Sequence, residues 1–199
     1  MESPILNVPW FFDLFRRIID GGQVANLRLF MARINHEAVL DVGCGIGSFC
    51  LMTDRKYMGV DIEPKYVEYA RNKYGSRGKQ FMSADAFSLD QKIGKFDVVS
   101  FINMIHHLSD EEVRKLFNSL KAVKPAHYFV VDVALEKGHF ILELFRRLDR
   151  GRYYRTRDAQ VALLESCGCK IEWVNMYCSR SHIYPHSVIL AAVPGSDPR

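Results

Sequence analysis

The sequence lacks the apolar run of about 18 residues that a membrane-spanning helix needs. It also lacks a basic N-terminal stretch followed by an apolar one, so we expect no secretion signal. Cysteine is scarce: the five residues are an odd number, which predicts free thiols in a reducing cytoplasm. With 13 glycines and 7 prolines, the composition excludes collagen-like and wholly disordered chains. A chain of 199 residues then predicts a single domain of ordinary size.

Charge of either sign is nearly balanced, with one local exception. Lys and Arg number 27 against 23 Asp and Glu, and the net charge of +4 is too small to indicate nucleic acid as a partner. Residues 146–157 contain six arginines and one aspartate. The whole positive excess of the chain therefore lies in this one segment.

Short apolar runs alternate with helical patterns, which predicts an α/β fold with a doubly wound parallel sheet. The expected strands are residues 39–42, 57–61, 80–82, 96–102, 128–133, 170–177 and 186–193. The expected helices are residues 47–55, 64–74, 110–121, 139–149 and 158–167. Ser109 and Glu112 form a capping box before the third of these helices. The last two strands have no helix between them, so we expect an antiparallel pair at the sheet edge.

A glycine-rich loop follows the first expected strand, with Gly43, Gly45 and Gly47 at a spacing of two. Glycine adopts positive φ and lets a ligand approach the backbone without meeting a Cβ atom. The start of a following helix adds N–H groups and the positive end of the helix dipole. The loop therefore predicts a ligand site at the carboxyl end of this strand.

Two acidic residues end the next two expected strands. Asp61 lies eighteen residues after Gly43, where doubly wound sheets place an acid that binds a ribose diol. Asp85 follows the third strand. Because the carboxyl ends of parallel strands meet at one edge, we expect all three strand ends to form one crevice.

These motifs together resemble those of the class I S-adenosylmethionine-dependent methyltransferases, over residues 37–193. The matching segments are Asp41–Gly47, Gly59–Asp61, Ala84–Ala86, Phe96–Phe101 and Ile105–Leu108. The resemblance implies a Rossmann-like sheet of seven mostly parallel strands with an antiparallel last strand. It also implies S-adenosylmethionine as the cofactor.

The resemblance assigns the methionine end of this cofactor to the glycine loop. Gly43, Gly45 and Gly47 would pass under the methionine part, with Cys44 as a small residue between them. Asp41 would help to organise the ammonium group, and Asp41 as a strand-end cap is the alternative. Asn103, just past the fourth strand, would lie near the sulfonium.

The adenosine end is assigned to the following two strand ends. Asp61 would bind the ribose hydroxyls and Ile62 would lie against the adenine. Asp85 would accept a hydrogen bond from the adenine amino group, and Ala86 would offer its backbone N–H. Asp85 as a simple turn residue is the alternative.

Two other activities fit the sequence poorly. A nicotinamide-binding domain requires GxGxxG, whereas Gly45 is followed here by Ile46-Gly47-Ser48. Methyltransferases that act on the exocyclic amines of nucleobases carry Asn/Asp-Pro-Pro-Tyr/Phe after the fourth strand. Residues 101–104 read Phe-Ile-Asn-Met, so a nucleobase amine in nucleic acid is not the expected acceptor.

Candidate catalytic residues are scarce, because methyl transfer mainly needs alignment of the reactants and, for some acceptors, removal of a proton. His106 and His107 follow the fourth strand and titrate in a suitable range. Packing or loop hydrogen bonding by these histidines stays open as the other interpretation. Cys167 and Cys169 lack a second pair at zinc spacing, so we expect no metal site.

The arginine-rich insertion, residues 136–157, would cover the acceptor pocket if the resemblance holds. The residues expected to bind the acceptor are Arg150, Arg152, Arg155, Tyr153, Tyr154, His182 and Tyr184. Arginine matches carboxylate or phosphate with two hydrogen bonds, which favours an anionic acceptor. There are two alternatives. One is docking of the arginines on anionic lipid headgroups or RNA, helped by an aromatic helix at residues 10–19. The other is pairing of the arginines with nearby acids.

The sequence therefore predicts one methyltransferase domain over residues 1–199, with a helical cap at 1–36 and a Rossmann-like core at 37–193. We expect a small-molecule acceptor, anionic or lipophilic, with oxygen as the favoured atom. An RNA or protein methyltransferase is the second interpretation. A methyltransferase-like protein that binds the cofactor without turnover is the third.

Overall fold

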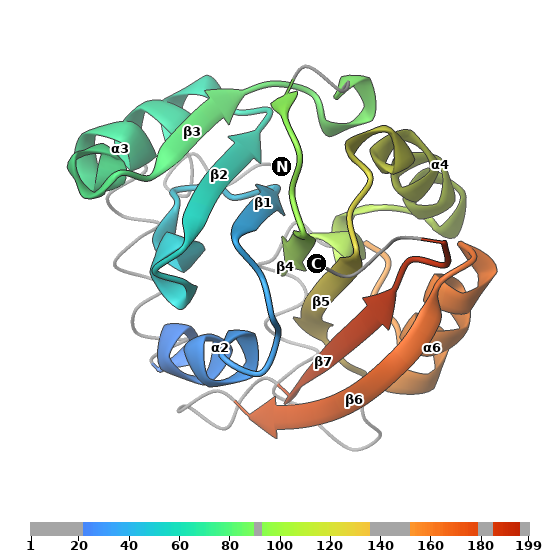
Figure 1. The fold of residues 1–199 in the computed structure, drawn as a ribbon. Helices are drawn as coiled ribbons and strands as arrows, with labels where there is room; N and C mark the ends of the chain where they lie inside the picture. The colour runs from blue at the N-terminus through green and yellow to red at the C-terminus, as the bar shows by residue number, and fades with distance from the viewer. Residues whose placement is uncertain (1–21, 90–92, 136–151, 179–184, 196–199) are drawn as a thin grey trace.

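Seven strands form one sheet in the order β3-β2-β1-β4-β5-β7-β6 (Figure 1). The structure is a computed structural model, and it describes residues 22–89, 93–135, 152–178 and 185–195. The strands are β1 Ala38–Val42, β2 Lys56–Asp61, β3 Gln80–Ser83, β4 Val98–Ile102, β5 His127–Val133, β6 Lys170–Cys178 and β7 Pro185–Ala192. Each lies within two residues of its expected bounds at both ends. The predicted fold class is confirmed.

The direction of the strands follows the predicted pattern. Neighbouring strands among β1 to β5 pair in parallel, whereas β7 lies antiparallel between β5 and β6. Every residue of β1 and β4 is buried. A nearly continuous apolar strand fits the centre of a sheet that is covered on both faces.

Helices cover both faces of the sheet. They are α2 Gln23–Met31, α3 Pro64–Tyr74, α4 Asp110–Leu120 and α6 Arg157–Ser166. Leu27 of α2 and Val67 of α3 belong to one buried cluster, and Leu116 of α4 and Leu163 of α6 belong to the other. The capping box before α4 is confirmed, because the Ser109 and Glu112 side chains bond each other's backbone N–H.

The helix expected at 47–55 is wrong in type and length. This segment is a short 3₁₀ helix, η2, at Ser48–Met52. Gly47 precedes it in the left-handed region with φ +77°, and Thr53 is already extended. Phe49, Cys50 and Met52 are all buried, so the segment is fixed by packing on three of its five positions rather than by one helical face.

Several expected features lie outside the described residues. These are the helices at 10–19 and 139–149 and the side chains of Arg150, His182 and Tyr184. In the described part of the chain, no helix has the length and apolar character needed to cross a membrane.

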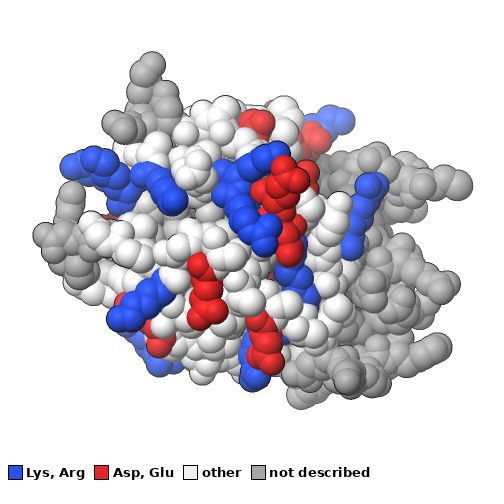
Figure 2. All heavy atoms as spheres, turned by 90° about the vertical axis from the view of Figure 1, so that its right-hand side faces the viewer, with Lys and Arg blue, Asp and Glu red and all other residues white. Residues whose placement is uncertain are grey.

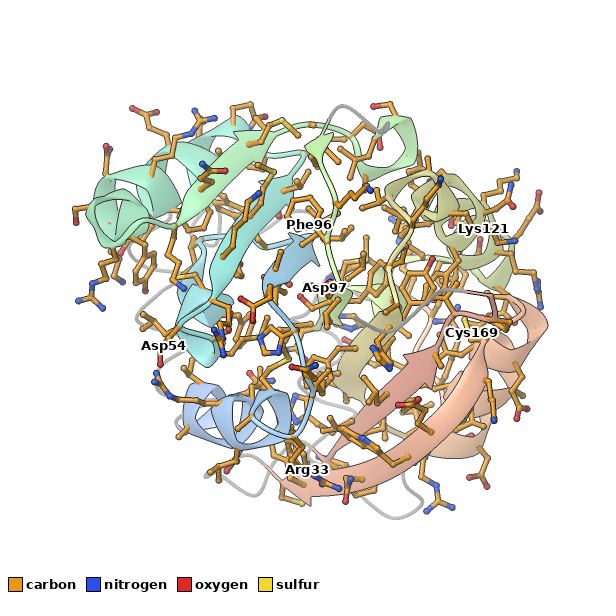
Figure 3. All side chains as sticks on the ribbon, in the orientation of Figure 1. Arg33, Asp54, Phe96, Asp97, Lys121 and Cys169 are labelled. Atoms are coloured by element: carbon orange, nitrogen blue, oxygen red, sulfur yellow. The ribbon has the colours of Figure 1, made fainter. Side chains whose placement is uncertain are left out.

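The amino ends of the strands are closed by side-chain hydrogen bonds. Asp97, labelled in Figure 3, accepts hydrogen bonds from the backbone N–H groups of Glu37 and Ala38, both at 2.9 Å. A cavity of about 550 Å³ lies beside this anchor, where Arg33 stacks over Trp173 at 4.9 Å. None of its lining residues is a predicted site residue. The predicted site lies at the opposite, carboxyl edge of the sheet.

Candidate active site

The glycine loop between β1 and η2 adopts the conformation that its sequence predicts. Gly43, Gly45 and Gly47 have φ values of +72°, +54° and +77°. A Cβ atom on Gly47 would lie 2.6 Å from the Phe81 ring, and one on Gly43 would lie 2.6 Å from Met104 Cγ. A Cβ atom on Gly45 would meet no heavy atom within 4 Å. Gly43 and Gly47 are therefore required by packing, whereas Gly45 borders open space.

Asp61 holds the middle of this loop in place. Its Oδ2 accepts a hydrogen bond from the Gly45 N–H at 2.7 Å, and its Oδ1 accepts one from the Glu63 N–H at 2.9 Å. Burial raises the pKa of Asp61 above its ordinary value. The Ile62 N–H also interacts with this carboxylate. A carboxylate has about four lone-pair positions, so three N–H groups still leave acceptor capacity for a ligand at the point where the loop is open.

Cys44 acts as the small residue that the sequence predicts inside the loop. It is buried, and a Cβ atom on Gly59 of β2 would lie 2.7 Å from its sulfur. Burial raises the pKa of the Cys44 thiol well above its ordinary value, which makes it a poor nucleophile. The sequence motif includes Gly59 but does not predict this close contact with Cys44. The cysteine and the glycine let the loop pack closely on β2.

Asp41 lies at the base of the loop, buried within the sheet. It accepts hydrogen bonds from the Tyr57 hydroxyl at 2.6 Å and from the Ser100 hydroxyl at 2.7 Å. Burial, and next the charge of Asp41, raise the pKa of Tyr57 well above its ordinary value. Sequence reasoning missed Tyr57 and Ser100, although a polar residue in each of two apolar strands was the available signal. Both oxygens of Asp41 serve to hold three strands together.

The predicted adenosine residues lie side by side at the ends of β2 and β3. The Ala84 N–H donates to the Asp61 carbonyl at 3.1 Å. Asp85 Oδ1 accepts a hydrogen bond from the Phe87 N–H at 2.9 Å and begins the short helix η4, Ala86–Ser88. Ile62 is 72% exposed. An exposed isoleucine between two acidic strand ends offers an apolar surface that suits a flat ring.

Asn103 completes the same edge from the end of β4. Its φ of +52° is left-handed, a conformation that asparagine tolerates better than most residues. Its N–H donates to the Val131 carbonyl at 2.8 Å, and its Nδ2 donates to Gln23 Oε1 at 3.4 Å. Asn103 Oδ1 is buried and accepts no hydrogen bond within the described residues. An unpaired buried acceptor costs about 1–3 kcal/mol, so this oxygen fits a positively charged ligand group.

A buried histidine–aspartate pair forms the other half of the edge. His106 Nδ1 bonds Asp132 Oδ1, and the His106 N–H donates to Asp132 Oδ2 at 2.9 Å. The two side chains are 4% and 1% exposed. The Tyr154 ring stacks on His106 at 5.1 Å with an interplanar angle of 13°. Asp132 was not predicted as a site residue, although an acid near the end of an otherwise apolar strand was visible in the sequence.

Arg155 fastens the end of the arginine-rich insertion to the turn that carries His106, η6 at Ile105–His107. Its guanidinium donates to Asp110 Oδ1 at 2.8 Å and to the carbonyls of Ile105 and Leu108 at 3.0 and 2.7 Å. The N–H groups of Arg152 and Tyr153 both donate to the His106 carbonyl. In this arrangement the Arg155 guanidinium is committed to the fold, as the ion-pair alternative expects.

The described face over α4 and α6 carries both signs of charge. Blue and red side chains are interspersed there in Figure 2. Lys115 pairs with Glu111 at 2.7 Å, and Arg157 pairs with Asp158 at 2.9 Å. Cys169 lies in the partly buried layer below, where burial raises its pKa to about 12. Among the described residues, no three possible ligands gather in a metal site.

Comparisons with known proteins agree with this geometry. Residues 39–125 match the family of methyltransferase domains. Ajmaline N-methyltransferase from Rauvolfia serpentina is 38% identical over 82 residues, which cover 37% of this chain and 28% of that protein. The chain thus matches less than a third of the length of this curated relative.

Solved structures extend the likeness to nearly the whole fold. Magnesium protoporphyrin IX methyltransferase from Synechocystis PCC 6803, crystallised with S-adenosylhomocysteine, has a TM-score of 0.71 at 21% identity. That likeness covers 94% of this chain and 96% of the other. The [4+2]-cyclase SpnF has a TM-score of 0.66 at 18% identity, over 86% and 80% of the two chains.

Residues 39–125 match in sequence, and the fold matches over nearly the whole chain. The resemblance seen in the sequence motifs is therefore confirmed. Residues 39–125 of this chain thus match a methyltransferase domain, and the chain shares its fold with a methyltransferase crystallised with S-adenosylmethionine or S-adenosylhomocysteine.

Proposed function

We propose that this protein transfers a methyl group from S-adenosylmethionine to a small organic molecule. The observation that carries the proposal is the open space over Gly45, bordered by Asp61, which holds the loop while keeping acceptor capacity. Small-molecule methyltransferases among the relatives support the acceptor class.

The donor would lie along the edge formed by β1, β2 and β3. The loop glycines would pass under its methionine part, and Asn103 Oδ1 would accept from, or lie beside, its cationic end. Asp61 would bind the ribose hydroxyls, while Ile62, Asp85 and the Ala86 N–H would surround the adenine. When bound, S-adenosylmethionine supplies a methyl group on a positively charged sulfur. The residues of this chain hold it and align the acceptor with it.

His106 would remove the proton from an acceptor that carries one. Donation from Nδ1 to Asp132 places the lone pair of a neutral His106 on Nε2, and the aspartate stabilises the imidazolium that forms. Asp132 would thus act on His106 and not on the acceptor. His107, which is exposed on the same turn, remains a second predicted base.

The acceptor would lie beside η6 and the end of the arginine-rich insertion. Arg152 and Tyr153 are exposed there, and Tyr153 is 42% accessible. Arg150, Tyr154, His182 and Tyr184 remain predicted acceptor contacts, while Arg155 would support the site through η6. The sequence favours oxygen as the acceptor atom. The relative named an N-methyltransferase makes nitrogen a second acceptor atom to test.

The cellular location is proposed on the cysteines. All five are free thiols, which supports a reducing compartment such as the cytoplasm.

A second candidate function is cofactor binding without methyl transfer. The structural neighbour that is a [4+2]-cyclase supports it, because a similar fold there serves a different reaction. The two candidates differ in whether S-adenosylhomocysteine accumulates when an acceptor is supplied.

The experiment combines calorimetry with a transfer assay. We expect S-adenosylmethionine to bind the purified protein, and Asp61→Ala to weaken its binding about tenfold or more through the lost hydrogen bonds to a charged group. Methyl-labelled donor is then incubated with phenols, carboxylates and amines, with His106→Gln as the matched variant. Label transfer that His106→Gln reduces without changing donor affinity supports the proposal. Donor binding without transfer across these acceptors favours the second candidate, and no donor binding contradicts both.

A further inference from the structure

The first residue of α2 is a buried polar side chain in an otherwise apolar interface. Gln23 is only 2% exposed, and Gly22 before it turns the chain with a left-handed φ of +93°. Its Oε1 accepts the hydrogen bond from Asn103 Nδ2, across 80 residues of sequence. Figure 1 shows α2 on the side of the sheet where η2 follows the glycine loop, and α2 packs against η2. A helix that precedes the first strand thus contacts Asn103 at the carboxyl edge of the sheet.

We propose that Gln23 is a positioning residue that turns the amide of Asn103 so that Oδ1 faces the cationic end of S-adenosylmethionine. The site would thereby favour the methyl donor over its product, S-adenosylhomocysteine. This inference rests on the proposed function, because it names what distinguishes donor from product at that same site.

The argument begins with the two ends of the Asn103 amide. An asparagine amide carries two N–H donors at one end and an acceptor oxygen at the other. Because Gln23 Oε1 holds the Nδ2 end, Oδ1 points away from α2. The backbone cannot turn with it, since the Asn103 N–H is bonded to the Val131 carbonyl at 2.8 Å. The buried Oδ1 accepts no hydrogen bond from the described residues.

The second step is the location of this oxygen. The next residue, Met104, packs so closely on Gly43 that a Cβ atom there would lie 2.6 Å from Met104 Cγ. Asn103 therefore adjoins the loop assigned to the methionine part of the donor. The sulfur of the donor carries a positive charge that disappears when the methyl group leaves. A fixed amide oxygen near that sulfur stabilises the charged donor more than the neutral product.

The experiment measures dissociation constants for S-adenosylmethionine and S-adenosylhomocysteine by calorimetry. Gln23→Leu removes the acceptor for Asn103 Nδ2 and frees the amide to rotate. We expect the dissociation constant of the donor to rise about tenfold while that of the product changes less than about twofold. Gln23→Glu keeps an acceptor oxygen and should keep the preference. Asn26→Leu makes the same kind of change elsewhere on α2 and should alter neither constant.

A structural role alone predicts a different pattern. If Gln23→Leu weakens donor and product equally, the residue only packs α2, and the inference is overturned. If Gln23→Leu does not fold, as thermal unfolding would show, Asn103→Gly removes the amide without straining a positive φ. An unchanged ratio of the two constants in that variant overturns the inference. If the unaltered protein binds neither compound, the proposed function itself fails and the inference falls with it.

Discussion

The two halves of the carboxyl edge are built from different materials. In the donor half, the groups that shape the site are mostly backbone: glycines at positive φ and N–H groups that bond Asp61 and Asp85. In the acceptor half, long side chains shape the site. His106 bonds Asp132, and Arg155 donates to the Ile105 carbonyl of η6. A backbone-built site leaves little freedom for substitution, whereas a side-chain-built site can be rearranged residue by residue. The donor, which the proposed function keeps constant, would lie on the half with little freedom.

The largest effects on stability and donor binding are expected at two glycines of the donor half. Gly47→Ala combines a positive φ with overlap on Phe81, so we expect it to lower the free energy of unfolding by about 3 kcal/mol. Gly45→Ala has the same kind of φ but open space around it, and should cost the fold only about 1 kcal/mol. Urea denaturation measures both values. Donor binding should still fall at least about tenfold in Gly45→Ala, because the new methyl group enters the ligand space.

Equal destabilisation by the two alanines would contradict the division between packing and ligand space. Unchanged donor affinity in Gly45→Ala would show that the donor does not approach this part of the loop.

The acceptor half should be sensitive to a single arginine. Arg155→Met removes the hydrogen bonds to Asp110 and to two carbonyls of the η6 region, so we expect unfolding to require about 2 kcal/mol less. Arg155→Lys should not restore it, because an ammonium cannot replace the planar fork. Arg152→Met is the control, because Arg152 bonds the η6 turn through its backbone N–H, which the substitution keeps. Chemical denaturation of all three variants gives their free energies of unfolding. Equal losses of stability in Arg152→Met and Arg155→Met would argue against a specific role of the Arg155 guanidinium.

The smallest effect concerns pH and Asp61. Burial raises the pKa of its carboxyl above the ordinary value of 3.8, because it penalises the ionised form relative to an exposed carboxyl. Ribose hydroxyls donate more strongly to a carboxylate than to a neutral carboxyl, so donor affinity should fall as the pH drops from neutral through the raised pKa. The change is at most about tenfold for each pH unit. Binding near that pKa should release protons, which calorimetry in buffers of different ionisation enthalpy detects.

Asp61→Asn should abolish both the proton release and the pH dependence in this range. If the release persists in that variant, another group is responsible and the placement of the donor beside Asp61 needs revision.

The difference between the halves also decided what the sequence could predict. Gly43, Gly45, Gly47 and Asp61 follow local rules of spacing after a strand, so their arrangement was predicted and the structure has them together. The partners of His106 were not predictable, because Asp132 lies 26 residues away and nothing local links the two. Gln23 was missed for the same reason. The helix expected at 47–55 failed because buried packing outweighed helical periodicity there.

The attachment of the arginine-rich insertion has one further consequence. The Leu135 N–H donates to the Arg155 carbonyl at 2.9 Å, and Ala134 forms a parallel bridge with Arg155. The described chain therefore leaves the sheet and rejoins it at the same place. The entropic cost of closing a loop between two such fixed points grows only slowly with the length of the loop. Under the proposed function, evolution could replace the segment between them, and with it the acceptor, while the donor half of the molecule stays as it is.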